Sequence, residues 1–171
     1  MAEALRTPQP VGCDDVPLVH PEAALSPSPL SPILVIEDDR VSAAVIKQHL
    51  VTLGLANPVR IAGDGDAAVS WLSQSPAEPN TNVPALILLD RELPGRSGLD
   101  VLRWLQSEPT LRRVPVVILT GSSDVDGISE AYALGVRSYL VKPIGFGALG
   151  EVVRGLDLRW AILPPEQEDE L

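Results

Sequence analysis

The sequence contains a single cysteine, Cys13, so no disulfide can form within the chain. Disulfides are rare where thiols are kept reduced, which makes the cytoplasm the natural expectation for this protein. No apolar run approaches the roughly 18 residues that a membrane-spanning helix needs. The first residues also lack the basic start and the apolar stretch of a secretory signal. We therefore expect a cytoplasmic protein without a membrane partner.

Positive charge is also scarce. The chain has 13 lysines and arginines against 23 aspartates and glutamates, and its net charge is −10 at neutral pH. A nucleic-acid-binding protein needs a basic surface, and the sequence offers none. The 171 residues are enough for one domain with a proper core. Because no second domain is long enough to bind DNA, we expect the protein to act through contacts with other proteins.

Both ends of the chain differ in composition from the middle. Residues 1–32 hold seven prolines and predict a disordered arm, because such a segment can form neither a helix nor a sheet ladder. This arm is either a ligand for a proline-binding module or a solubilising tail. Residues 159–171 form a C-terminal extension with an acidic tail. Residues 33–158 are the predicted folded domain.

The central feature of the folded part is the stretch ALILLDRELPGRSG, residues 85–98. Its five apolar residues are too few for a helix and follow a proline, so they predict a buried strand. The strand ends abruptly at Asp90, and Pro94, Gly95 and Gly98 come soon after. An aspartate in this position either forms a turn or takes part in chemistry.

Other strand-like runs end in polar residues in the same manner. In open parallel sheets, ligands bind outside the carboxyl ends of the strands. If these strands lie parallel, several acids, a hydroxyl group and one ammonium group converge there. Such a cluster predicts a site for a divalent cation and a phosphoryl group. The residues that end or follow the runs are Glu37, Asp38, Asp39, Asp90, Thr120 and Lys142.

Apolar residues at helical spacing separate the strands, so that five strands alternate with five helices. This alternation predicts an α/β protein with a parallel sheet covered by helices on both faces. Val41 and Val45 belong to the apolar stripe of the first helix, which Gly54 ends. Asp64 is expected to cap the second helix rather than bind a metal, and Gly135 to end the fourth. The predicted strands are Ile33–Ile36, Val59–Ala62, the strand that ends at Asp90, Val114–Leu119 and Val136–Val141.

These residues resemble a known family. The acid pair Glu37 and Asp38, the aspartate followed by proline and glycine, the threonine and the Lys-Pro pair occur in the order and at the distances of the receiver domain of two-component response regulators. The resemblance covers residues 33–158. It implies a flavodoxin-like, doubly wound sheet of five parallel strands in the order 2-1-3-4-5, with five helices. It also implies a single-domain signalling protein, not an enzyme beyond catalysing its own phosphorylation and dephosphorylation.

The resemblance implies a role for each group at the strand ends. Asp90 is the expected phosphoacceptor, and the expected donor is a phosphohistidine on a sensor histidine kinase. Asp38 and Asp90 would bind Mg²⁺ directly, Glu37 through a water molecule and Glu92 through its backbone carbonyl. Lys142 and the metal would neutralise the charge that develops on the phosphoryl oxygens.

Two further residues are expected to respond to phosphorylation. The hydroxyl group of Thr120 would move toward the phosphoryl group, and Tyr139 would turn into the space that Thr120 leaves. The surface formed by the fourth helix, the fifth strand and the fifth helix would then change. Taken alone, Thr120 and Tyr139 are also ordinary strand residues, and Lys142 an ordinary surface residue. In the family, the peptide bond before Pro143 is cis.

The chain departs from the family pattern near the site and resembles one subgroup at its end. Glu92 lies two residues after the phosphoacceptor, where an acid either repels the phosphoryl group or positions a water molecule for hydrolysis.

Residues 158–164 resemble the extension of small response regulators that partner bacterial phytochromes and form dimers through this end. Trp160, Ile162 and Leu163 would then anchor a homodimer; alternatively they pack on their own domain.

Other functions fit parts of the pattern. Asp90 could be the nucleophile of an aspartate-dependent phosphatase, although Glu92 only approximates the second aspartate of such enzymes. The chain could also be a receiver-like binding module that is never phosphorylated, which the complete set of site residues argues against. Gly145, Gly147 and Gly150 spell G-x-G-x-x-G, but a dinucleotide site needs further strand–helix units and an acid downstream. We expect these glycines to weaken the last helix instead.

Overall fold

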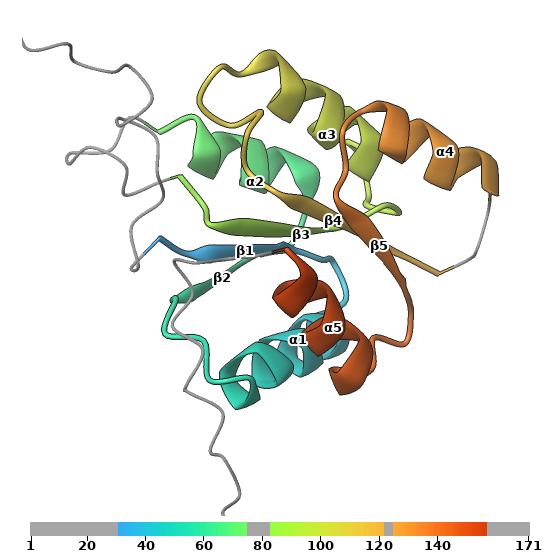
Figure 1. Cartoon of the computed structure of the whole chain (residues 1–171). Helices are drawn as coiled ribbons and strands as arrows, with labels where there is room; N and C mark the ends of the chain where they lie inside the picture. The colour runs from blue at the N-terminus through green and yellow to red at the C-terminus, as the bar shows by residue number, and fades with distance from the viewer. Residues whose placement is uncertain (1–30, 75–82, 122–124, 157–171) are drawn as a thin grey trace, which may run out of the picture.

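The computed structural model describes residues 31–74, 83–121 and 125–156. Within them, five strands alternate with five helices, as the sequence predicts (Figure 1). The strands are β1 (Ile33–Ile36), β2 (Val59–Ala62), β3 (Leu86–Asp90), β4 (Val116–Thr120) and β5 (Ser138–Val141). The helices are α1 (Arg40–Thr52), α2 (Gly65–Leu72), α3 (Gly98–Ser107), α4 (Val125–Ala133) and α5 (Phe146–Gly155).

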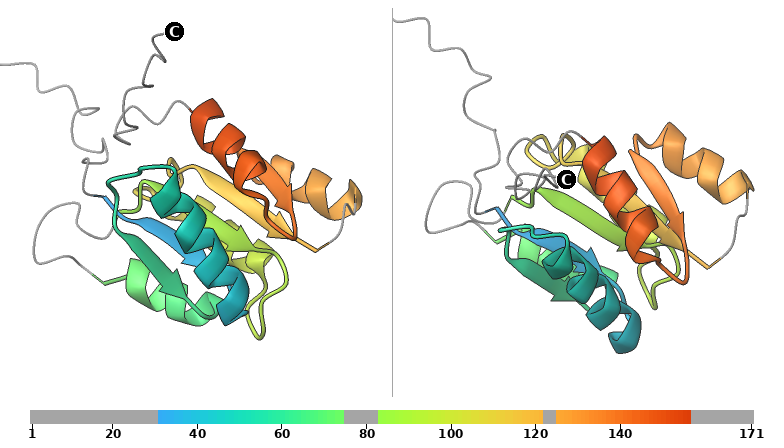
Figure 2. Two further views of the ribbon diagram at one scale, coloured as in Figure 1. Left: turned by 90° about the horizontal axis from the view of Figure 1, so that it is seen from below. Right: turned by 60° about the horizontal axis from the view of Figure 1, so that its bottom comes forward.

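The strands form one parallel sheet in the order β2-β1-β3-β4-β5. Helices α1 and α5 cover one face of the sheet, and α2, α3 and α4 cover the other (Figure 1, Figure 2). The register places Ile36 beside Leu89 and Thr120 beside Val141, so the carboxyl ends of these strands share one edge. The expected flavodoxin-like α/β fold is confirmed, including the strand order.

The central strands contribute to two separate cores, because successive residues of a strand point to opposite faces of the sheet. In β3, Leu86 and Leu88 pack on the side of α1 and α5. Ile87 and Leu89 pack on the side of α2, α3 and α4. All four side chains are completely buried. A strand covered on both faces must be apolar throughout, which explains the uninterrupted run before Asp90.

Two helix ends lie where the sequence predicts them. The Asp64 side chain accepts a hydrogen bond from the N–H of Ala67 at 2.6 Å and so caps α2. Helix α1 ends at Thr52, and Gly54 follows with a φ angle of 76°. This left-handed conformation suits glycine and turns the chain away from the helix axis.

Strand β5 begins later than predicted, at Ser138 instead of Val136. The N–H of Val136 donates to the carbonyl of Ala131, and that of Gly135 donates to the carbonyl of Tyr132. With a φ angle of 84° at Gly135, this is the Schellman arrangement that closes a helix. Val136 therefore belongs to the end of α4 and not to the strand.

Strand β4 also begins later than predicted, at Val116 instead of Val114. Pro115 has no N–H to donate to the sheet, although its carbonyl accepts a hydrogen bond from Ile87 at 3.0 Å. The N–H of Val114 donates to the carbonyl of Leu111 at 2.9 Å. Val114 is thus part of the turn that leads into the strand.

The prediction of which apolar residues of α1 face the core is partly wrong. Ala43, Ile46 and Leu50 face the core, whereas Val41 and Val45 are 71% and 43% exposed. The buried residues recur at intervals of three and four, and the two valines lie on an adjoining line of the helix. Their exposure leaves an apolar surface on this side of α1.

Some predictions concern residues outside the described ranges. These are the proline-rich arm, of which only the last residues are described, and the proposed dimer anchors Trp160, Ile162 and Leu163. Among the helices of the described ranges, none is long and apolar enough to cross a membrane.

Candidate functional site

Polar groups from four strands meet at one edge of the sheet. Asp90 and Thr120 are the last residues of β3 and β4, and they are 2% and 0% exposed. Glu37 directly follows β1, and Lys142 directly follows β5. The structure brings together the groups that the sequence predicts to converge. These groups meet because the carboxyl ends of parallel strands lie at the same edge of the sheet, as expected from the sequence.

Three carboxylates form a cluster that could hold a divalent cation. Glu37, Asp38 and Asp90 each offer one oxygen atom, and these atoms lie within 4.8 Å of one another. Glu37 and Asp90 are almost completely buried, whereas Asp38 is exposed. Mg²⁺ takes a few carboxylate oxygens of this kind and keeps water or phosphate oxygens as its other ligands. A cluster that is open on one side fits that requirement.

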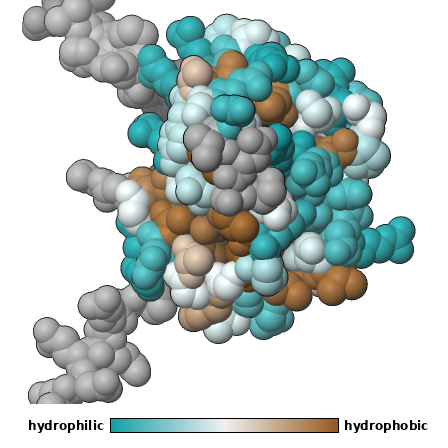
Figure 3. Space-filling model, turned by 90° about the vertical axis from the view of Figure 1, so that its right-hand side faces the viewer, coloured by the Kyte–Doolittle hydropathy of each residue, from teal (hydrophilic) through white to brown (hydrophobic). Residues whose placement is uncertain are grey.

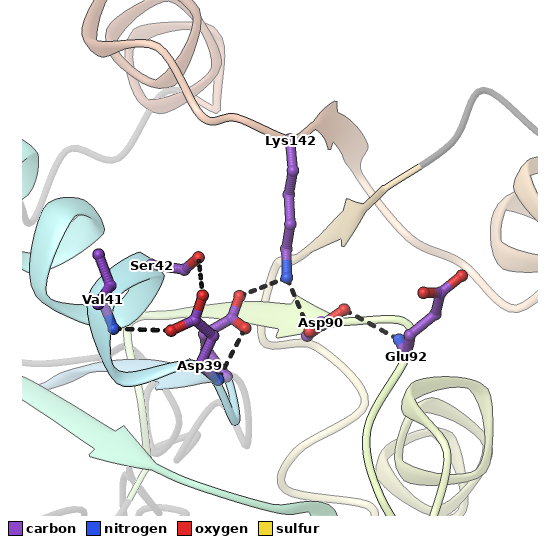
Figure 4. Close-up of polar contacts among 7 residues, drawn as sticks. Asp39, Val41, Ser42, Asp90, Glu92 and Lys142 are labelled. Carbon is purple, nitrogen blue, oxygen red and sulfur yellow. Dashed lines mark hydrogen bonds and ion pairs between the residues drawn. The ribbon is translucent and has the colours of Figure 1, made fainter.

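The ammonium group of Lys142 lies between two of these carboxylates (Figure 4). Its Nζ atom is 2.8 Å from Oδ2 of Asp90 and 2.7 Å from Oε2 of Glu37. Burial lowers the pKa of Lys142, but the contacts with Asp90 and Glu37 raise it by more, so the pKa is above its ordinary value. Lys142 therefore stays charged and offsets part of the negative charge of the cluster. The Lys142–Pro143 peptide bond is cis, as the family resemblance implies.

The surroundings of Glu37 disfavour its negative charge. Burial raises the pKa of this carboxyl group, the contact with Lys142 lowers it, and the charge of Asp90 raises it again. The net result is a raised pKa. Repulsion of this kind between neighbouring carboxylates is relieved when a cation binds among them.

Asp90 is held in place by its own loop. The N–H of Glu92 donates to Oδ1 of Asp90 at 2.9 Å. The N–H of Arg91 donates to the carbonyl of Leu119 at 2.9 Å, and the carbonyl of Arg91 accepts from Gly98 at 3.1 Å. Gly98 comes so close that a Cβ atom there would lie 2.2 Å from the backbone oxygen of Asp90. Only glycine allows this approach, which explains the presence of glycine at position 98.

Glu92 contributes its backbone, and not its carboxylate, to the site described here. Its side chain is exposed and points away from Lys142 (Figure 4). A metal contact through the Glu92 carbonyl, and a water-mediated one through Glu37, remain predictions.

Asp39, the third acid after β1, has a structural role. Its side chain accepts hydrogen bonds from the N–H of Val41 at 2.9 Å and the hydroxyl of Ser42 at 3.1 Å, and so caps α1. The bond from Val41, followed by that from Ser42, lowers the pKa of Asp39. Asp66 is also engaged away from the cluster, in an ion pair with Arg96 at 2.8 Å. The run of acids after β1 thus divides into two candidate metal ligands and one helix cap.

Thr120 and Tyr139 lie on β4 and β5, as the resemblance implies. Thr120 is fully buried, and its carbonyl accepts a hydrogen bond from the N–H of Lys142 at 2.8 Å. Tyr139 is half-buried, and its ring contacts that of Tyr132 on α4 edge to face. Tyr132 is not among the predicted residues, because a contact between a helix and a strand leaves no periodic signal in the sequence.

A groove adjoins the site between α1 and the segment that follows β5. Its volume is about 210 Å³, and Lys142 forms part of its wall. The exposed valines of α1 line one side, and Pro143 and Ile144 line the other. The residues that line the groove are Val41, Ser42, Val45, Ile46, Lys142, Pro143 and Ile144. An approaching partner would meet apolar surface directly beside the ammonium group.

Two glycines of the G-x-G-x-x-G pattern, Gly145 and Gly147, lie at the start of α5, and the third, Gly150, lies inside the helix, where a Cβ atom would lie 3.2 Å from the side chain of Leu53. Gly145 is the N-cap residue and provides no side-chain hydrogen bond. A Cβ atom added at Gly145 or Gly147 would meet nothing within 4 Å, so no close approach requires glycine there. Strand β5 before them is at the edge of the sheet. This placement differs from the central first strand on which a dinucleotide site is built.

Curated proteins with similar sequences include response regulators. The family model for the response regulator receiver domain matches residues 33–154. Response regulator Rcp1 of Synechocystis sp. is 35% identical over 133 residues, which cover 78% of this chain and 90% of Rcp1. Chemotaxis protein CheY of Pseudomonas aeruginosa is 31% identical over 121 residues, which cover 71% of this chain and 91% of CheY.

Solved structures lead to the same family. The bacteriophytochrome response regulator AtBRR matches with a TM-score of 0.66 and 35% identity, over 79% of this chain and 98% of AtBRR. The Mn²⁺-bound form of Rcp1 matches with a TM-score of 0.63 and 34% identity, over 79% of this chain and 96% of Rcp1. Receiver domains are signalling domains that accept phosphoryl groups from histidine kinases and bind Mg²⁺ at an acidic site. The chain belongs to the response regulator receiver domain family.

Proposed function

We propose that this protein accepts a phosphoryl group on Asp90 from a phosphohistidine of a sensor histidine kinase, in a reaction that depends on Mg²⁺. The observation that carries this proposal is the position of Asp90, which contacts the Lys142 ammonium group at 2.8 Å and shares a cluster with the carboxylates of Glu37 and Asp38. The surface of α4, β5 and α5 then changes and alters the binding of a downstream protein.

The residues at the strand ends have complementary tasks in this reaction. A carboxylate oxygen of Asp90 attacks phosphorus, and the O–P bond forms as the P–N bond to the donor imidazole breaks. The imidazole leaves with the bonding electron pair. Lys142 is placed to donate to an oxygen of the transferred group, because it already donates to Oδ2 of Asp90. When bound by Asp38 and Asp90, with Glu37 beside it, Mg²⁺ supplies further positive charge to the phosphoryl oxygens.

The donor is expected to approach from the open side of the cluster, where Asp38 is exposed. The groove beside Lys142 lies next to this approach, and its exposed Val41 and Val45 offer apolar contacts. A kinase domain that buries these valines would bring its phosphohistidine to the mouth of the site.

Acetyl phosphate tests the proposal without any kinase. The purified protein is incubated with acetyl phosphate and Mg²⁺, and its intact mass is measured. We expect one added phosphoryl group, no addition when EDTA removes the metal, and none in Asp90→Asn. An adduct that forms equally well in Asp90→Asn would contradict the proposal, as would the absence of any adduct in the wild-type protein. Repeated turnover of ordinary phosphoesters would indicate a phosphatase instead.

We further propose that the kinase is a bacterial phytochrome. The support lies in the relatives, since AtBRR and RtBRR are both described as bacteriophytochrome response regulators, and RtBRR is 34% identical to this chain. Transfer of labelled phosphate from an autophosphorylated bacterial phytochrome should be much faster than transfer from a sensor kinase of another type. Equal rates, or faster transfer from the other kinase, would argue against a phytochrome partner.

A further inference from the structure

Tyr132 and Tyr139 are the only two tyrosines of the chain, and they contact each other. Tyr132 lies on α4 and Tyr139 on β5. Their ring centroids are 6.3 Å apart, and the ring planes meet at 87°. Aromatic pairs in this edge-to-face geometry attract each other beyond the effect of the area they bury. The contact therefore favours the orientation that Tyr139 has in this structure.

Tyr132 stands on an anchored part of α4. Glu130, two residues earlier, forms an ion pair with Arg103 of α3. The carbonyl of Tyr132 accepts a hydrogen bond from the N–H of Gly135 at 3.0 Å, as part of the motif that ends the helix. Tyr132 is 47% exposed. It can therefore be replaced without opening a cavity in the core.

Tyr139 lies at the margin of the sheet, where β5 is the last strand. It is half-buried, and Val141 on the same side of the strand is 43% exposed. On this side of the molecule, apolar residues reach the surface between polar ones (Figure 3). Tyr139 thus packs against the core but is only half-buried, and the Tyr132 ring adds an aromatic contact.

Strand β5 connects this aromatic pair to the phosphoryl site. Val141 lies beside Thr120 in the register of β4 and β5. The next residue, Lys142, donates its N–H to the carbonyl of Thr120 at 2.8 Å. A turn of Tyr139 and a change at Thr120 therefore act on the same short segment of backbone.

We propose that Tyr132 restrains Tyr139 in its resting orientation and thereby opposes the phosphorylated state. This inference rests on the proposed function and on the inward turn of Tyr139 that the family resemblance implies once Asp90 is phosphorylated. The contact with Tyr132 must break during that turn. Weakening the contact shifts the equilibrium between the resting and the turned orientation of Tyr139 toward the turned one. By linkage, a ligand that favours the turned orientation then binds more tightly by the same factor. For an edge-to-face pair this factor is about two- to tenfold.

Two variants separate the aromatic contact from other effects of Tyr132. Tyr132→Leu removes the ring and keeps an apolar side chain that favours helices. Tyr132→Phe keeps the ring and is the matched control. Each variant has lost Tyr132, so Tyr139 is its only tyrosine. Labelling with 3-fluorotyrosine therefore places fluorine at Tyr139 alone.

The first measurement uses the free proteins and compares the width of the ¹⁹F line of Tyr139. In Tyr132→Leu we expect exchange broadening that grows with magnetic field, because Tyr139 samples a second orientation. In Tyr132→Phe we expect a line as sharp as in the wild-type protein. Equal widths in the two variants would overturn the inference. The line position is not used, since loss of a nearby ring shifts it without any motion.

The second measurement is the affinity for beryllofluoride in the presence of Mg²⁺, since beryllofluoride mimics the phosphoryl group. We expect Tyr132→Leu to bind about two- to tenfold more tightly than Tyr132→Phe, which should match the wild-type protein. An unchanged or weaker affinity in Tyr132→Leu would overturn the coupling between Tyr132 and the site. Failure of the wild-type protein to bind would count against the proposed function, while the line widths still decide whether Tyr132 restrains Tyr139.

Discussion

Lys142 contacts two of the three carboxylates in the cluster, Asp90 and Glu37, at 2.8 and 2.7 Å. One ammonium group cannot neutralise three acids, so the cluster keeps negative charge for a metal. The raised pKa of Glu37 follows from burial first, and the charge of Asp90 adds to it. The strand ends thus set the positions of these side chains, and neighbouring charges and burial set their pKa values.

Replacing Lys142 separates metal binding from phosphoryl transfer. In Lys142→Ala, we expect phosphorylation by acetyl phosphate to slow by roughly tenfold to a hundredfold, because a donor to the phosphoryl oxygens is lost. Binding of Mg²⁺, measured by calorimetry, should persist, since the carboxylates remain. Lys47→Ala is the control, because Lys47 is the other lysine of the chain and is exposed on α1. An unchanged rate in Lys142→Ala would contradict the assigned role.

Gly98 is the residue that lets α3 approach the backbone of Asp90. A Cβ atom at this position would lie 2.2 Å from the Asp90 oxygen and 2.8 Å from the Arg91 Cα atom. Because backbone must shift, Gly98→Ala should lower the free energy of unfolding by about 1–3 kcal/mol and slow phosphorylation. Urea denaturation and the acetyl phosphate assay measure the two effects. Wild-type values in both assays would show that the loop accepts a side chain here.

At the scale of elements, the two glycines at the start of α5, Gly145 and Gly147, serve no close contact. A Cβ atom at Gly147 would meet nothing within 4 Å, so Gly147→Ala should stabilise the protein by up to about 1 kcal/mol. Urea denaturation compares this variant with Gly98→Ala, where the same chemical change has the opposite expected sign. A loss of stability in Gly147→Ala would indicate that the position is constrained by something other than local space.

The start of α3 is held by a reciprocal pair, in which Ser97 donates to the Asp100 carboxylate and accepts from the Asp100 N–H. The hydrogen bond from the Ser97 hydroxyl lowers the pKa of Asp100 below its ordinary value of 3.8. A carboxyl group with a depressed pKa stabilises the fold above its unfolded pKa, and that contribution is lost as the pH falls through the folded pKa. The stabilising contribution is therefore present at neutral pH and disappears below 3.8.

Asp100→Asn tests this dependence through urea denaturation at several pH values. The variant should be less stable than the wild-type protein at neutral pH, and the difference should shrink as the pH is lowered below 3.8. Glu151→Gln, which removes an exposed acid of α5, is the control for the loss of one negative charge. A difference that stays constant with pH would contradict the role of the Asp100 charge.

At the scale of the whole molecule, the fold follows from local patterns in the sequence. Uninterrupted apolar runs mark strands covered on both faces, and the alternation with helical periodicity predicts the parallel sheet. The site was predictable for a related reason, because Asp90, Thr120 and Lys142 all end or follow such runs. The strand order could not be read from these patterns and came from the family resemblance.

Features that depend on contacts between elements could not be predicted. The pair of Tyr132 and Tyr139 joins a helix to a strand, and no periodicity reports it. Val41 and Val45 have the apolar character of core residues, yet a neighbouring line of α1 faces the sheet. Asp39 looks like a further site acid in the sequence, and only the hydrogen bonds at the start of α1 reveal it as a cap.

The C-terminal residues Trp160, Ile162 and Leu163 remain predicted anchors of a homodimer. Removing all residues after Asp157 should then convert a dimer into a monomer, as measured by size exclusion with light scattering. Removing only residues 166–171 takes away the acidic tail and keeps the anchors, so the dimer should persist. An unchanged mass in the longer truncation would exclude the anchor role.

Asp90 is the proposed carrier of the phosphoryl group. The most direct test is to phosphorylate the protein in the presence of Mg²⁺, reduce it with borohydride and locate the product by peptide mass spectrometry. Reduction converts an aspartyl phosphate into homoserine, which marks the residue that was modified. We predict homoserine at position 90 and at no other acid. Homoserine at position 38 or elsewhere, or none in a protein whose intact mass shows a phosphoryl group, would rule out Asp90 as the phosphoacceptor.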